Sequence, residues 1–196
     1  MSSSLVGSEM CIRDRKDTLF ILNLLRLLAF QIGNDISYTE LAKRLNSNKK
    51  TVMRYLQLLE KTFVIFPLHG FSRNLRSEFT QTPRYFFWDN GIRNILVSNF
   101  NSLNVRDDVG KLWENYCISQ RMIRNHYRGE TVNAYFWRTY TQKEIDMVEE
   151  KGGRLYGFEM KWNEKRKVKP PKMFLETYTN SEFGVIDRLN HLDFIS

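Results

Sequence analysis

The first half of the chain has the periodicity of helices separated by short polar turns. Apolar residues fill most sides of residues 18–31, which predicts a buried helix that stops at Gly33. Ser37 is followed three residues later by Glu40, a spacing typical of a capping box at a helix start. Residues 37–45 then carry a single apolar stripe. Two successive helices are therefore expected before the next polar turn.

The pattern that follows is a helix, a strand and a returning strand. The polar turn 46–48 leads into residues 49–62, whose apolar positions again fit a helix. The runs 63–68 and 84–88 are typical of strands, and two strands after a helix-turn-helix would form a wing. We therefore expect a winged helix-turn-helix domain over residues 16–100.

The second half mixes one long helix with several short strands. An amphipathic helix is expected at 109–127 after a polar linker at 101–108, and Gly152 with Gly153 marks a hairpin turn. These elements predict a second domain at 101–196, with a mixed sheet flanked by helices. The chain as a whole is assigned to the α/β (α+β) class. Further strands are expected at 133–140, 144–150, 154–162 and 182–187, with a short helix at 173–178.

Residues 1–15 show no periodicity and no relation to the sequence that follows. They resemble translated adapter sequence of the kind that contaminates assembled reads, so we expect them to be non-native or disordered. On this hypothesis the native protein begins further upstream and the chain is a fragment of it.

Charge and composition favour an anionic partner in the cytoplasm. The net charge is +8 and the isoelectric point is about 9.5. Cys11 and Cys117 lie far apart and form no disulfide framework, which indicates a reducing cytoplasm. The apolar run 19–30 is short for a bilayer and contains Arg26, so no membrane partner is expected. No GxxxxGK[ST] loop occurs, which predicts no ATP site in this chain.

One stretch carries candidate chemistry, the sequence EIDMVEEKGGRLYGFEMKW at residues 144–162. Glu159 and Lys161 lie two residues apart on a strand and therefore project from one face. The hairpin brings Asp146 beside Glu159, and converging carboxylates are costly unless a cation joins them. Oxygen ligands suit Mg²⁺ or Mn²⁺, and a nearby ammonium completes a set suited to metal-assisted phosphodiester hydrolysis. The alternative is an ordinary cross-strand charge cluster on a solvated face.

Basic residues at two places predict contacts with DNA. The first group lies at the start of the third helix, where phosphate and base contacts are made in helix-turn-helix proteins. The second lies in the loop 165–172, where its charge suits a phosphate track. The alternatives are a soluble helix face, a winged helix packed on another domain, and a solvated loop. The candidate residues are Lys49, Lys50, Thr51, Arg54, Lys165, Arg166 and Lys167.

The hairpin resembles the core of the PD-(D/E)xK nuclease superfamily, which has the restriction-endonuclease-like fold. The resemblance implies that Asp146 and Glu159 are metal ligands and that Lys161 is the catalytic lysine. Such folds often add an acid from the preceding helix, and Glu114 in LWENY matches that place. The implied cofactor is Mg²⁺ or Mn²⁺.

A wider resemblance covers nearly all of residues 17–196. The segments that carry it are SYTELAKRL, KKTVMRYLQLLEKTFVIF, FFWDNGIRN, VGKLWENYCIS, YFWRTYTQKEIDMV and GFEMKW. They resemble the C-terminal region of predicted bacterial and archaeal AAA+ ATPases, a region that includes a domain of unknown function with the restriction-endonuclease-like fold. The resemblance implies an ATPase domain N-terminal to residue 17 and outside this chain, acting in cis.

Two functional hypotheses follow. In the first, the chain binds DNA and cleaves phosphodiester bonds with Mg²⁺. In the second, the fold is kept but the chemistry is idle, and the chain is a DNA- or protein-binding regulatory module of the ATPase. A homo-oligomer is a further expected assembly under either hypothesis.

Overall fold

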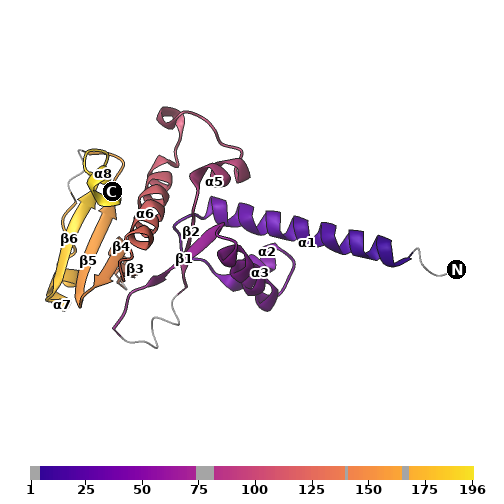
Figure 1. Ribbon diagram of the computed structural model, residues 1–196, viewed down its shortest axis with the longest axis horizontal. Helices are drawn as coiled ribbons and strands as arrows, with labels where there is room; N and C mark the ends of the chain where they lie inside the picture. The colour runs from indigo at the N-terminus through magenta and orange to yellow at the C-terminus, as the bar shows by residue number, and fades with distance from the viewer. Residues whose placement is uncertain (1–4, 74–81, 140, 165–167) are drawn as a thin grey trace.

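The computed structural model describes residues 5–73, 82–139, 141–164 and 168–196, with side chains from residue 16 onward. Figure 1 shows the elements in chain order. They are α1 (Leu5–Phe30), α2 (Tyr38–Arg44), α3 (Lys49–Lys61), β1 (Ile65–Gly70), β2 (Arg84–Phe87), α5 (Asn90–Leu96), η1 (Leu103–Val105), α6 (Val109–Tyr127), β3 (Asn133–Arg138), β4 (Glu144–Lys151), β5 (Arg154–Met160), α7 (Lys172–Thr177), β6 (Ser181–Ile186) and α8 (His191–Ile195).

The strands in the described part of the chain form one six-stranded sheet in the order β2-β1-β3-β4-β5-β6. Neighbours β1/β2, β3/β4 and β4/β5 are antiparallel, whereas β1/β3 and β5/β6 are parallel. The sheet is therefore mixed, and helices flank it (Figure 1). This confirms the predicted mixed α/β class. The sheet also runs through both predicted domains, because β1 pairs with β3 through His69 and Gly70.

Helices α2 and α3 both begin at a polar cap, and the cap at Ser37 is the one that the sequence predicts. The Ser37 side chain accepts a hydrogen bond from the Glu40 N–H at 3.3 Å, and the Asn48 side chain accepts one from the Thr51 N–H at 2.8 Å. The Glu40 carboxylate does not complete the expected capping box, since it pairs with Arg44 at 2.7 Å. Strands β1 and β2 follow α3 as an antiparallel pair, as the wing hypothesis requires.

Helix α1 is longer than its apolar pattern predicts. It begins at Leu5 and ends at Phe30, so the backbone of residues 5–15 is helical where we expected non-native or disordered sequence. Residues 1–4 lie outside the described residues, and the origin of residues 1–15 stays a prediction. The chain turns at Gly33, which has a φ of +69° and donates its N–H to the Tyr85 carbonyl at 3.3 Å.

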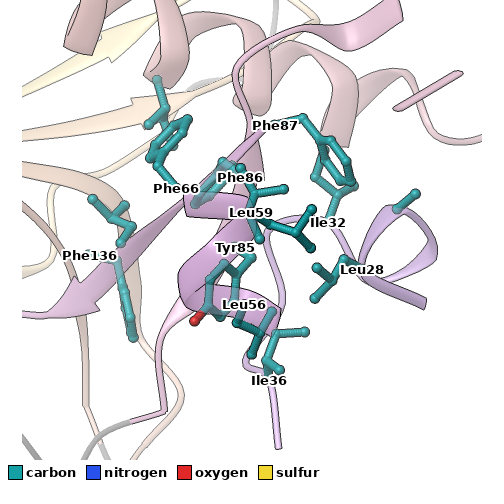
Figure 2. Close-up of a cluster of buried hydrophobic side chains, with 14 of the residues drawn as sticks. Leu28, Ile32, Ile36, Leu56, Leu59, Phe66, Tyr85, Phe86, Phe87 and Phe136 are labelled. Carbon is teal, nitrogen blue, oxygen red and sulfur yellow. The ribbon is translucent and has the colours of Figure 1, made fainter. Parts of the chain in front are cut away.

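A single apolar core joins the N-terminal helices to the sheet. Figure 2 shows side chains from α1, α3, β1, β2 and β3 packed together. The same cluster includes Trp113, Cys117 and Ile118 of α6, which lie in the second predicted domain. A smaller cluster on the other side of the sheet is centred on Phe174 of α7. The residues labelled in Figure 2 are Leu28, Ile32, Ile36, Leu56, Leu59, Phe66, Tyr85, Phe86, Phe87 and Phe136.

Several details differ from the periodic pattern. Met53 and Leu58 are apolar residues of α3, yet they are 38% and 46% exposed because they fall beside the buried stripe. Helix α8 and the turn η1, which interrupts the expected linker, span only five and three residues, too few for a periodic pattern to predict them. Among the described helices, none combines the length and apolar character needed to cross a bilayer.

Candidate functional site

A β-bulge positions the first candidate acid. Tyr135 of β3 pairs with Val148, but Trp137 pairs with Ile145, so two residues of β4 face one residue of β3. Asp146 is one of these two residues, and bulges of this kind redirect side chains, often next to active sites. Asp146 is 8% exposed, and its Oδ2 accepts a hydrogen bond from the Met160 N–H at 2.8 Å.

The acid and base at the end of β5 lie together, as their spacing predicts. Lys161 Nζ is 2.6 Å from Glu159 Oε1, and the side chains are 24% and 12% exposed. Strand β6 extends the parallel pairing to this end of β5, where the Ile186 carbonyl accepts the Lys161 N–H at 2.8 Å. Both side chains therefore project from a backbone that is held on one side by β6.

Glu114 approaches from helix α6. It is 6% exposed, and its Oε2 lies 3.0 Å from Lys111 Nζ. Its Oε1 is buried and has no hydrogen-bond partner among the residues that the structure describes. Gly33 covers this carboxylate: a Cβ added there would lie 3.0 Å from Oε1. The turn after α1 therefore closes over the acid.

The three carboxylates influence one another electrostatically. Burial, and then the charge of Asp146, raises the pKa of Glu114 to about 7. Burial also raises the pKa of Glu159, and the Asp146 charge adds to the increase. The pKa of Asp146 itself is raised by burial, although the Met160 N–H and the Lys161 charge oppose that increase. Raised pKa values in neighbouring buried acids indicate a place where a cation would be stabilising.

Four further charged residues lie around these acids and were not identified from the sequence. Lys111 pairs with Glu114 one helical turn away, a spacing that sequence reasoning could have used. Arg84 of β2 is 3% exposed and binds Glu144 at 2.6 Å and Asp35 at 3.0 Å. Its charge lowers the pKa of Glu114, opposing the effect of burial. Arg84 lies far from Glu144 in sequence, so no local pattern indicates that pair.

The predicted metal ligands do not form a preassembled set. Among the described residues, no group of three or more His, Cys, Asp and Glu side chains is arranged to hold a metal ion. Glu159 is engaged by Lys161, Glu114 by Lys111, and Asp146 by a backbone N–H. The four predicted site residues are thus linked by electrostatic effects. Each of the three acids already has a lysine or a backbone N–H as its partner.

The predicted DNA-contacting residues of α3 lie at its start and on its exposed side. Lys49, Lys50 and Arg54 are exposed, and the Arg54 guanidinium lies 4.9 Å from the centre of the Tyr55 ring. Thr51 is half-buried, and its N–H is used by the Asn48 cap. The other candidates, Lys165, Arg166 and Lys167, lie outside the described residues.

Comparison with known families divides the chain into two matched regions. Residues 12–104 match the family described as domain of unknown function (DUF8612). Residues 109–192 match the family described as domain of unknown function (DUF4143). The candidate acids and Lys161 all fall in the second region, and α2 and α3 fall in the first.

The chain is also similar to longer mycobacterial proteins. Uncharacterized proteins of Mycobacterium tuberculosis and Mycobacterium bovis are each 29% identical to it over 137 residues. The match covers 69% of this chain but 30% of each relative, so the chain spans under a third of the curated relatives it matches. No solved structure matches the chain.

Proposed function

We propose that this chain is a DNA-binding module with a Mg²⁺-dependent phosphodiesterase site, working within a longer protein of the AAA+ ATPase family. The observation that carries the proposal is that the charge of buried Asp146 acts on both buried Glu114 and half-buried Glu159, which lies beside Lys161. Burying like charges together costs free energy, and a bound cation would offset that cost. The resemblance to PD-(D/E)xK nucleases supports the same assignment.

The donor set fits a hard divalent ion. All three side chains offer carboxylate oxygens, which Mg²⁺ and Mn²⁺ prefer. The buried Glu114 Oε1 without a partner is the kind of atom that a bound cation would satisfy. Glu114, Asp146 and Glu159 would hold the ion, which when bound polarises a phosphoryl oxygen and acidifies a bound water.

Protein side chains would perform the remaining tasks. Lys161 places an ammonium beside Glu159, from which it can donate a hydrogen bond to a phosphate oxygen. Lys49, Lys50 and Arg54 would contact the DNA backbone from the start of α3. The net charge of +8 would strengthen both contacts and make them sensitive to salt.

Titration of Mn²⁺ into the purified chain tests the metal site. We expect Asp146→Ala to lose at least about tenfold in affinity, because one of three carboxylates and its charge are removed. Glu182→Ala, on an exposed side chain of β6, is the matched control and should bind like wild type. Equal affinity in the wild type and Asp146→Ala would refute the metal site and leave an ordinary charge cluster.

A catalytically idle regulatory module is the second candidate. It is favoured by the internal neutralisation of the site, in which Lys111 and Lys161 already pair with Glu114 and Glu159. Cleavage of plasmid DNA by the full-length protein distinguishes the two candidates. Divalent-metal-dependent nicking that Asp146→Ala abolishes supports the enzyme, whereas DNA binding without nicking supports the module.

A further inference from the structure

An open groove lies between α1 and the end of α2, away from the acids described above. Its volume is about 540 Å³. Half of the lining residues are apolar, and two of these are unusually open to solvent: Leu19 is 59% exposed and Phe30 is 68% exposed. The other apolar lining residues are Phe20, Leu27 and Leu45. In Figure 1 the N-terminal end of α1 extends beyond the other elements.

The lining residues of α1 have the spacing of a helix-packing seam. Lys16, Phe20, Asn23, Leu27 and Phe30 follow one another at alternating intervals of four and three residues. This alternation keeps side chains on one stripe facing a partner helix, as the a and d positions do in coiled coils. The middle position of this seam is the polar Asn23.

The described residues that line the groove carry charge of one sign. Among them, Lys16, Arg26 and Arg44 are basic, and none is an aspartate or glutamate. Arg44 also pairs with Glu40, which lies outside the groove lining. The neighbouring acid on α1, Asp17, acts electrostatically on Tyr55 of α3 instead of entering the groove. An occupant must therefore combine an apolar stripe with negative charge.

We propose that this groove binds an amphipathic helix of a partner protein whose apolar stripe is flanked by acidic side chains. Such a helix would cover Leu19 and Phe30 with its apolar face and place carboxylates near Lys16, Arg26 and Arg44. A second copy of this chain is a poorer occupant, because two α1 grooves would bring the same cations together. DNA is also poorer, because a duplex offers no apolar stripe to the exposed Phe30.

Two designed peptide probes test the proposal against the whole chain. Both are helices of roughly three heptads with Leu at a and d; one has Glu at e and g and the other has Lys. We expect the Glu peptide to bind at least about tenfold more tightly in fluorescence anisotropy, since only its flanks oppose the groove cations. Phe30→Ala and Arg26→Glu should each weaken it by about tenfold.

Matched control variants test whether a loss of peptide binding comes from the groove itself or from a general change in exposed apolar surface or net charge. Phe63→Ala removes an equally exposed phenylalanine, 75% open, and Lys172→Glu makes the same change in net charge as Arg26→Glu. Both controls should bind the Glu peptide like wild type. No binding, equal binding of both peptides, or equal losses in the controls would overturn the proposal. A dimer that Phe30→Ala dissociates, or duplex DNA binding lost in Arg26→Glu without peptide binding, would assign the groove to those occupants instead.

Discussion

At the scale of single residues, the environment of Glu114 decides what the site can do. A buried carboxylate is costly unless hydrogen bonds or cations compensate for its lost hydration. Lys111 contacts one oxygen at 3.0 Å, while the other has no partner among the described residues. Gly33 leaves that second oxygen its space, because it carries no Cβ and tolerates a φ of +69°. Lys111 thus holds Glu114 in place, while the second carboxylate oxygen can still accept a hydrogen bond or bind a cation.

Gly33→Ala should perturb this arrangement more than a simple backbone effect would. The left-handed conformation alone costs an alanine about 1–2 kcal/mol. The new methyl group would also lie 3.0 Å from Glu114 Oε1 and 3.3 Å from Lys111 Nζ, so the pair must shift. We expect urea unfolding to show a larger loss of stability than in Gly129→Ala. That control has a φ of +62° and nothing within 4 Å of its added Cβ. Equal losses would mean that the Glu114 side chain moves aside freely.

At the scale of elements, the segment between α5 and α6 is fixed by one acid. Asp108 pairs with Arg93 of α5 and with Arg106, whose Nε lies 2.8 Å from Asp108 Oδ1. Both guanidinium groups are almost fully buried, at 5% and 2% exposure. The hydrogen bond from Arg106, and then that from Arg93, lowers the pKa of Asp108 to about 2. The segment that the sequence predicted as a polar linker is therefore tied to α5.

Asp108→Asn should reduce stability in a manner that depends on pH. The pKa of Asp108 is depressed in the folded state, so its stabilisation is present above the unfolded value of 3.8 and is lost as the pH falls towards 2. At about pH 7 we expect Asp108→Asn to be about 1–3 kcal/mol less stable, since two buried cations lose their charged partner. Near about pH 2 the gap should nearly close, because the wild type loses the same interaction. Asp107→Asn, on an exposed neighbour, should keep the wild-type profile, and a gap that does not vary with pH would contradict the ion-pair account.

Local patterns allowed most elements to be predicted, and physical reasons explain the misses. Spacing within one strand placed Glu159 beside Lys161, and the cap at Ser37 marked a helix start, because these effects act between residues close in sequence. The bulge that redirects Asp146 depends on a register set by β3, which no local pattern contains. Arg84 reaches Glu144 only because β2 and β4 belong to the same sheet. Contacts made through tertiary structure were thus the ones missed.

At the scale of the whole molecule, α6 completes the edge of the sheet. Strand β2 lies at one end of the strand order, where its outer backbone groups need partners. The Asn115 side chain supplies them: its Oδ1 accepts the Phe87 N–H at 2.8 Å, and its Nδ2 donates to the Phe87 carbonyl at 2.9 Å. Asn115 is fully buried. One side chain of the second predicted domain therefore acts as a neighbouring strand for the first.

Asn115→Ala should consequently destabilise both predicted domains together. It leaves two buried backbone groups of Phe87 unpaired, at a cost of about 1–3 kcal/mol each. The core that joins α1, β2 and α6 is continuous, so the loss should spread through the molecule. We expect native-state hydrogen exchange to show equal losses of protection in β1 and in β5, with Asn133→Ala, at an exposed asparagine, as the control. A loss confined to β1 and β2 would instead mean that residues 16–100 and 101–196 unfold independently, despite their shared sheet.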